Sequence, residues 1–220
     1  MKRTLILASL AIVVCATSAL AARDAFNRRA LGPNWVVPTG RLFINFDQLQ
    51  GATGSLGYDV ESSSDTTVAA TVYLASTDVE YGAVASGDVA GGNNAFVKIQ
   101  AQNADGHFSN AGFYTGNNSG GSFFALKREV PSPATVSVSF CGTVATMKIK
   151  SAAGRQIYSY DYGASFGTGG GLGTYGAVAL DKYRSKPGGC ALQERGIWIK
   201  KGSSAGDLSL SKSSPEHKAY

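Results

Sequence analysis

Histidine and cysteine are scarce in this chain, and their scarcity argues against several kinds of catalytic site. Only two histidines are present, His107 beside an Asp-Gly turn and His217 near the C-terminus. A zinc site needs three or four ligands, and no cluster in the sequence offers them. A Ser-His-Asp arrangement would depend on His107, and nothing resembling a nucleophile elbow is present. The sequence therefore argues against zinc enzymes and serine hydrolases.

Charged residues are also sparse, at 16% of the chain. The formal net charge is +5, and removing the two basic residues of the export signal described below leaves it only mildly positive. Nucleic-acid binding requires clustered basic residues. The closest clusters are Lys148/Lys150 and Lys200/Lys201, each on or beside a predicted strand. A solvated strand face or strand end explains them, so we expect no nucleic-acid partner.

Long apolar runs are missing apart from residues 5–14, which follow two basic residues and precede the small residues at 19–22. This is the pattern of a secretory signal, and it is too short and wrongly flanked for a membrane span. Val14, which precedes Cys15, is not small, so a plain signal is favoured over a lipoprotein signal. We predict a signal peptide over 1–22, no transmembrane span, and a secreted or cell-envelope location, extracellular or periplasmic.

Helix-period patterns are nearly absent, whereas glycine, β-branched and aromatic residues are common. Short alternating runs punctuated by Gly, Asn and Pro are typical of a sandwich or jelly roll. No internal repeat, linker or second domain is visible. We therefore predict an all-β, two-sheet antiparallel β-sandwich over 23–201. Residues 202–220, rich in Ser, Lys, Gly and Pro, are predicted to form a disordered tail.

Alternation of apolar and polar residues locates the expected strands. They are 41–46, 56–61, 66–75, 80–86, 95–102, 108–115, 122–129, 135–140, 143–150, 155–162, 173–180 and 193–201. The cleanest is 66–75, whose apolar side chains at even positions line one face. In 135–140 the apolar residues are expected in the core, with Ser and Thr facing water. A loop is predicted over 182–190.

The cysteines bear on the compartment of the protein. Once the signal is removed with Cys15, only Cys141 and Cys190 remain. Two cysteines in an exported protein suggest one disulfide, which would close a loop of about 50 residues. Two buried free thiols are the alternative.

Residues 24–37 lie between the export signal and the first strands. Their large apolar side chains, Phe26, Leu31 and Trp35, are separated by turn-forming residues. We predict that this segment is an N-terminal clasp, which lays these side chains over the β core before the chain enters the first strand.

The same segment carries a family resemblance. Asp-x-Phe-Asn-Arg at 24–28, followed by Leu-Gly-Pro-x-Trp at 31–35, resembles the opening of bacterial secreted domains of the concanavalin A-like lectin/glucanase (laminin-G-like jelly-roll) superfamily. The end of the chain departs from that pattern, because Gly-Ile-Trp-Ile-Lys at 196–200 replaces the usual closing Phe-Asp-Asn-Phe strand. The resemblance implies a concanavalin A-like fold and a habit of binding carbohydrate, whereas one fold hosts many activities.

Because the superfamily includes glucanases, pairs of carboxylate residues are candidate catalytic acids. Retaining hydrolysis needs two carboxyl groups about 5–5.5 Å apart. Asp59/Glu61 and Asp78/Glu80 have the i, i+2 spacing of one strand face. However, the Glu-x-Asp-x-x-Glu or Glu-x-Asp-x-Glu strand of the laminarinase-type glucanases is missing. We interpret these acids as turn or surface residues and predict no catalytic residues.

Calcium is the one candidate cofactor. Lectin-like sandwiches often hold it with loop oxygen atoms, and Asp88, Asn93, Asn94 and Asp105 are oxygen-bearing residues in predicted turns. Ordinary turn chemistry explains the same residues, because Asp and Asn favour such positions. The expectation is no required cofactor, with calcium as an alternative.

Three tyrosines form the most suggestive candidate site. Tyr158, Tyr160 and Tyr162 alternate along one strand and therefore share a face. A row of flat rings with polar tips is suited to stacking on sugars, so these residues are the candidate ligand-binding set. In the alternative, the row faces the partner sheet and belongs to the core.

These observations together favour an exported, non-catalytic binding module for carbohydrate, with a polysaccharide or glycan as partner. Two other interpretations are retained. One is a structural or adhesive cell-envelope protein that uses the sandwich to bind other proteins, which large exposed aromatic patches without sugar affinity would favour. The other is a divergent glycoside hydrolase, which would require acidic residues gathered in a groove.

Overall fold

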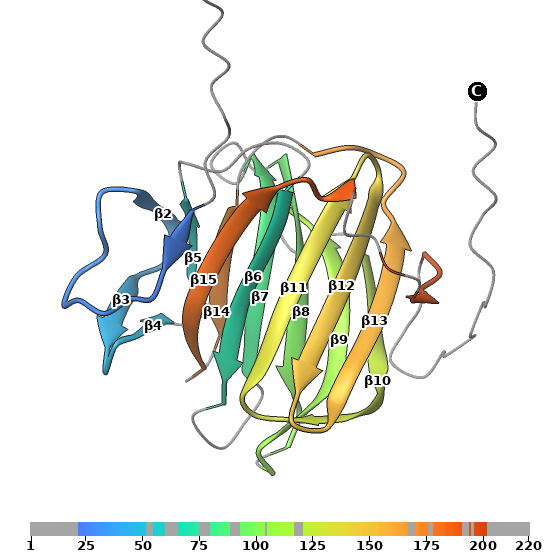
Figure 1. The fold of residues 1–220 in the computed structure, drawn as a ribbon, viewed down its shortest axis with the longest axis horizontal. Helices are drawn as coiled ribbons and strands as arrows, with labels where there is room; N and C mark the ends of the chain where they lie inside the picture. Colours follow the sequence, from blue (N-terminus) through green and yellow to red (C-terminus); the bar gives the residue numbers. More distant parts are fainter. Residues whose placement is uncertain are drawn as a thin grey trace, which may run out of the picture.

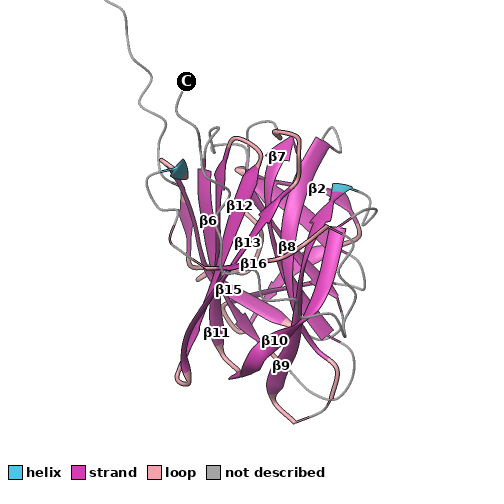
Figure 2. Cartoon of the chain, turned by 90° about the vertical axis from the view of Figure 1, so that its right-hand side faces the viewer, coloured by secondary structure: helices cyan, strands magenta, loops and turns pink. Residues whose placement is uncertain are grey.

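The computed structural model describes residues 22–51, 55–59, 66–74, 80–88, 93–103, 105–116, 121–166, 170–175, 178–190, 194 and 196–201. These residues form two β-sheets that lie face to face (Figure 1, Figure 2). No α-helix occurs in the described part of the chain, and this part accordingly contains no helix that could cross a membrane. The predicted signal peptide and tail lie outside the described residues except for Ala22.

One sheet has nine strands, and its central strands form the front layer of Figure 1. Their spatial order is β16 (Ile197–Trp198), β13 (Gly154–Asp161), β12 (Val144–Ser151), β11 (Ala134–Cys141), β6 (Thr66–Tyr73), β15 (Ala179–Pro187), β4 (Gln48–Gly51) and β3 (Leu42–Asn45), with β1 (Arg23–Asp24) also paired to β15. All of these pairs are antiparallel except the short parallel pair of β13 with β16.

The other sheet has seven strands and forms the rear layer of Figure 1. Their order is β10 (Gly121–Pro131), β9 (His107–Thr115), β8 (Asn93–Ala101), β7 (Glu80–Asp88), β14 (Gly170–Tyr175), β5 (Ser55–Asp59) and β2 (Trp35–Thr39). Every pair in this sheet is antiparallel. The predicted all-β, two-sheet antiparallel sandwich is thus confirmed.

The core lies between the sheets and follows the predicted alternation. On β6 the even positions Val68, Ala70 and Val72 are at most 1% exposed. From the seven-stranded sheet, Phe113 stacks on Tyr160 of β13, with ring centroids 5.3 Å apart. Apolar side chains of both sheets belong to one cluster, so burial of apolar area joins the sheets.

The N-terminal clasp is confirmed. Phe26 is fully buried and Trp35 is 9% exposed, their rings pack against each other, and the Trp35 ring also meets Tyr183 of β15 edge-on. The Asp24 carboxylate organises this segment, because it accepts a hydrogen bond from the Trp35 indole (2.7 Å) and forms a two-pronged ion pair with Arg28. Such charge-assisted bonds are the stronger ones. The clasp therefore has both an apolar and an ionic anchor.

The prediction for the chain around 173–190 was wrong. The single strand expected over 173–180 is two strands in different sheets, β14 and β15, and β15 occupies most of the expected loop. The register of β15 against β6 shifts between Asp181 and Arg184, where Lys182 has a positive φ of 54°. This bulge puts the buried Leu180 and Tyr183 three positions apart, so the two-residue period disappears from the sequence.

The C-terminal segment also differs from its prediction. Of the described residues at 194 and 196–201, only the two of β16 pair as a strand, and the pair with β13 is parallel. Beyond it, the Ser122 hydroxyl of β10 donates to the Lys200 carbonyl at 2.8 Å. The segment thus contacts the edge strand of each sheet.

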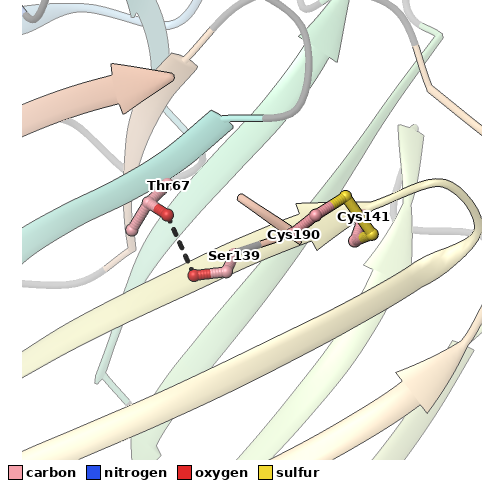
Figure 3. The surroundings of a disulfide bond; sticks show 4 residues. All are labelled: Thr67, Ser139, Cys141 and Cys190. Carbon is pink, nitrogen blue, oxygen red and sulfur yellow. Dashed lines mark hydrogen bonds between the residues drawn. A yellow bond between two sulfur atoms is a disulfide. The ribbon is translucent and has the colours of Figure 1, made fainter. Parts of the chain in front are cut away.

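The predicted disulfide joins Cys141 of β11 to Cys190, 49 positions further along the chain. In Figure 3 it lies beside the Thr67–Ser139 hydrogen bond that connects β6 and β11. It therefore attaches the chain that follows β15 to the middle of the nine-stranded sheet. A covalent bond of this kind fits an oxidising compartment.

Candidate ligand-binding face

The structure places the tyrosine row in the core. Tyr158 is fully buried and Tyr160 is 2% exposed. Their ring faces are covered by Phe124 and Phe113 of the opposite sheet. Tyr162 is half-buried, and its hydroxyl donates to backbone carbonyl oxygens of the seven-stranded sheet at 3.1 and 3.3 Å. Burial raises the pKa of Tyr162 well above its ordinary value. The row therefore faces the partner sheet and belongs to the core, which is the alternative interpretation of the sequence.

The structure does not bring the described acids of the two candidate pairs together. Glu61 and Asp78 lie outside the described residues. Asp59 is in register with Gly170, which pairs with Ser86 on β7. Glu80 begins β7, six residues away and hence about 20 Å along the strand. That separation is far beyond the roughly 5–9.5 Å used by glycosidases.

The four candidate calcium residues are likewise divided between two ends of the sheet. Asp88 pairs with Asn93, at the turn that joins β7 to β8. Asp105 lies at the turn after β8, and its carboxylate accepts from the His107 backbone amide at 2.9 Å. The length of β8 separates these turns by about 25–30 Å. Among the described residues, no group of three or more His, Cys, Asp or Glu is arranged to hold a metal ion.

The outer face of the nine-stranded sheet carries many small hydroxyl side chains. On β11, Ser137 and Ser139 alternate with core residues and therefore point outward. Hydroxyl groups bond between neighbouring strands at two places, Thr67 with Ser139 at 3.0 Å and Thr146 with Ser159 at 3.1 Å. The middle of this face is consequently a polar floor of short side chains.

Basic side chains border that floor on two sides. Arg184 and Lys186 of β15 stand on one side together with Arg23 of β1, and all three are exposed. Lys148 and Lys150 of β12 stand on the other side. Strands β6 and β11 run between these two rows. At about 4.8 Å per strand spacing, the two basic rows are roughly 14 Å apart.

The floor and its borders form an open depression of about 310 Å³, which we call the outer-face groove. It is lined by Arg23, Thr67, Ala69, Thr135, Ser137, Ser139, Thr146, Lys148, Lys150, Arg184, Ser185 and Lys186. Five of these residues are basic and none is acidic. The groove therefore offers many hydrogen-bond donors and acceptors under a positive electrostatic potential.

A short ridge bounds the groove beyond β12. Glu194, on the segment that follows the disulfide, forms ion pairs with Lys148 of β12 and with Arg155 of β13. The hydrogen bond from Lys148 is the main cause that lowers the Glu194 pKa, so Glu194 is ionised near neutral pH. Next to it, Gly196 lies so close to Ile157 that an added Cβ would approach the Ile157 backbone to 2.8 Å. The C-terminal segment thus rests on the outer face.

A second depression of about 500 Å³, the edge pocket, lies on the far side of this ridge. It is lined by Lys127, Arg128, Arg155, Gln156, Ile157, Gly196 and Ile197. Lys127 and Arg128 belong to a bulge in β10. That bulge is held by β13, because the Tyr158 hydroxyl accepts from the Lys127 amide at 2.8 Å and the Gln156 side-chain amide donates to the Arg128 carbonyl at 2.8 Å.

The described part of the opposite outer face contains an aromatic cluster with a buried lysine. Phe96 of β8 stacks on Tyr114 of β9, with centroids 5.5 Å apart. The Lys98 ammonium lies 4.3 Å from the Tyr114 ring centroid, a cation–π distance. Lys98 is 5% exposed, and burial lowers its pKa to about 8. The two rings are half-buried and stacked on each other.

The sequence predicted that several residues of the outer-face groove face solvent, but it did not predict that they line one depression. The Ser and Thr positions of 135–140 were expected to face water, and Lys148 and Lys150 were expected on a solvated strand face. No sequence pattern singled out Arg23, Arg184 or Lys186, because they lie far from those residues in the chain. Strand order, which the alternation of residues does not encode, brings the two basic rows to the same floor.

Comparisons with known proteins identify the fold. Neither a protein-family model nor a curated protein sequence matches this chain. Among solved structures, a lichenase (β-1,3-1,4-glucanase) from a mouse hindgut metagenome aligns with a TM-score of 0.54 at 8% identity, covering 76% of this chain and 99% of the lichenase. The catalytic domain of a laminarinase from Thermotoga petrophila gives 0.52 at 11% identity, with 74% and 95% covered. Lectin II from Ulex europaeus gives 0.50 at 10% identity, with 77% and 99% covered.

These similarities show that the chain has the concanavalin A-like jelly-roll fold, as the N-terminal segment predicted. At such low identity they show the fold alone. Lectins and glucanases share it, so the fold is compatible with binding and with hydrolysis.

Proposed function

We propose that this protein is an exported, non-catalytic carbohydrate-binding protein and that it holds its glycan in the outer-face groove. The observation that carries the proposal is the groove itself, an open depression of about 310 Å³ with a floor of Ser and Thr side chains. Hydroxyl groups donate and accept hydrogen bonds, which matches the alternating donors and acceptors of a sugar. The fold supports the proposal, since lectins share it. The disulfide supports export.

The absence of a paired acid in the groove favours binding over hydrolysis. Hydrolysis of a glycosidic bond requires two carboxyl groups flanking the bond. The described lining contains Ser, Thr, Ala, Lys and Arg only. Glu194, which meets the groove lining at Lys148, already pairs with Lys148 and Arg155. A lone, ion-paired carboxylate does not make a glycosidase.

Filling the groove tests the proposal. Ser137 lies on the floor between Ala69 and Lys148 and is half-buried. Ser137→Tyr should place a ring in the depression and weaken glycan binding about tenfold or more, which corresponds to roughly 1.4 kcal/mol or more. Binding of the purified protein to immobilised polysaccharides would be measured by biolayer interferometry. Ser165→Tyr is the matched control, because Ser165 is exposed and lines neither depression.

Three outcomes are informative. Loss of binding in Ser137→Tyr with retention in Ser165→Tyr supports the groove as the site. Equal binding by both variants contradicts it and directs attention to another face, such as the Phe96–Tyr114 cluster. Failure of the unmodified protein to bind any polysaccharide contradicts carbohydrate binding and favours a structural or adhesive role in the cell envelope.

A further inference from the structure

We propose that the glycan recognised by the outer-face groove is anionic, a polysaccharide that carries carboxylate or sulfate groups. This inference rests on the proposed function and adds the chemical class of the ligand. It concerns the charges that surround the groove, whereas the proposed function concerns its hydroxyl floor.

The lining of the groove is positively charged, and on the β15 side no described acid forms an ion pair with its basic residues. Arg23, Arg184 and Lys186 are exposed, and no ion pair joins any of them to another described residue. On the other side Lys148 pairs with Glu194, which lies on the ridge outside the lining. A ligand in the groove would therefore contact several cations and no described carboxylate.

Some of these cations lie so close together that their mutual repulsion destabilises the protein when no ligand is bound. Arg23 and Arg184 are register partners on neighbouring strands, and so are Lys150 and Arg155. Like charges directly opposite each other on neighbouring strands are destabilising. Glu194 already offsets the second pair through Arg155, whereas no described ion pair offsets the first, so an anion in the groove would relieve the repulsion between Arg23 and Arg184. Arginine and lysine together also match carboxylate and sulfate oxygens as hydrogen-bond donors.

The second depression indicates that the ligand is a chain. The edge pocket presents Lys127, Arg128 and Arg155, and Arg155 is the register partner of Lys150 at the border of the groove. Basic residues thus border the groove on both sides and occur again at the β10 edge, beyond Glu194. Basic residues at these separate places suit a polymer with an acidic group on repeated units better than a single sugar.

The lining also argues for a polysaccharide over a nucleic acid. Proteins that bind single-stranded nucleic acids combine a basic groove with aromatic side chains on which the bases stack. The described lining of both depressions contains no aromatic residue. It contains Ser and Thr side chains between the cations, which suit the hydroxyl groups of a sugar chain.

A charge-matched pair of variants provides the test. The site variant combines Lys150→Gln, Arg184→Gln and Lys186→Gln, which removes three exposed cations from the groove. The control variant combines Arg29→Gln, Arg41→Gln and Lys182→Gln, three exposed cations that line neither depression. Both variants have the same net charge, so any non-specific attraction falls equally in the two.

Polymers that share the same backbone but differ in charge show how much the charge of the ligand contributes to affinity. Dextran, carboxymethyl dextran and dextran sulfate share a backbone and differ in charge, and polygalacturonate adds a natural uronate chain. We expect the unmodified protein to bind the three anionic polymers and to bind dextran at least about tenfold more weakly. The site variant should lose about tenfold or more in affinity, since hydrogen bonds to charged groups are each worth about that factor or more. The control variant should change about twofold or less by the same scale.

Other results would overturn the inference in distinguishable ways. Equal affinity for dextran and its anionic derivatives, abolished by Ser137→Tyr, would leave carbohydrate binding intact and refute anionic specificity. An equal loss in both triple variants would show attraction to net charge alone. Equal or tighter binding to single-stranded DNA or to phosphatidylglycerol vesicles than to the anionic polysaccharides would identify a different class of ligand.

Discussion

Tyr160 illustrates how burial decides the role of a residue that the sequence leaves open. Its ring stacks on Phe113 at a centroid distance of 5.3 Å and meets the Tyr162 ring edge-on at 4.8 Å. The pattern of the strand showed that the tyrosines share a face. It did not show which face lies against the other sheet. The structure places the aromatic face inward, where offset and edge-on ring contacts add to the burial of apolar area.

Tyr160→Ala should therefore act on stability. Removing a buried aromatic ring from a packed core costs about 3–5 kcal/mol. We expect a loss of that size in the free energy of unfolding, measured by urea denaturation followed by circular dichroism. Tyr160→Phe, which keeps the ring, is the control and should lose much less. A stable Tyr160→Ala protein with weakened glycan binding would contradict the core assignment and restore the tyrosine row as the site.

Lys98 makes a prediction about pH. Burial lowers its pKa to about 8 in the folded protein, whereas the ordinary value is about 10.4. Between these values the unfolded chain binds more protons than the folded one, so stability should rise as pH increases. We expect the free energy of unfolding to increase from pH 8 to pH 9, where unfolded tyrosines, whose pKa is about 10, are still mostly protonated. Lys98→Met should flatten this rise, and an unchanged slope in that variant would show that another group causes it.

At the scale of elements, the bulge in β15 explains the main error of the sequence interpretation. The strand changes register between Asp181 and Arg184, so its inward residues do not follow one two-residue period. The alternation of residues also could not predict the two-residue strand β16, because its partner is a parallel strand about 40 residues earlier in the chain. In contrast, β6, β11, β12 and β13 have regular registers, and their alternation predicted them well.

The disulfide supports the element that borders the groove. It fixes the chain after β15 onto β11, next to the Thr67–Ser139 bond (Figure 3). In the chain-entropy account, a loop of 49 residues gives a disulfide about 4 kcal/mol of stabilisation. We expect reduction with dithiothreitol to lower the free energy of unfolding by about that amount in urea titrations. The double variant Cys141→Ser/Cys190→Ser should behave like the reduced protein and should not respond to the reductant, and a response would indicate an effect unrelated to the disulfide.

At the scale of the whole molecule, both sheets depend on one core. Buried side chains from β6, β8, β9, β11 and β13 belong to the same cluster. Neither sheet buries its inner face without the other, so separate unfolding of one sheet would expose much of this apolar area to water. We therefore predict that the domain over 23–201 unfolds as a single cooperative unit.

The two tryptophans provide the measurement. Trp35 belongs to β2 of the seven-stranded sheet and Trp198 to β16 of the nine-stranded sheet. In the single-tryptophan variants Trp35→Phe and Trp198→Phe, fluorescence should report the same urea midpoint as far-ultraviolet circular dichroism of that variant, which is a test of two-state behaviour. A fluorescence transition that precedes the circular dichroism transition in one variant would reveal an element that detaches first.

The sequence by itself determined the fold class and predicted the N-terminal clasp, and it left the two mature cysteines as either a disulfide or free thiols, which the structure decided. The first two follow from local signals, because alternation marks strands that are apolar on one side and large apolar residues next to turn residues mark the clasp. Only the tertiary structure decided which face of each strand meets the partner sheet and which strands lie side by side. Arg23, Lys148 and Arg184 lie far apart in the sequence and border one groove because β6 and β11 separate β12 from β15. The hydrophobic effect responds to burial without regard to chain order, so a surface assembled from distant strands leaves no local pattern.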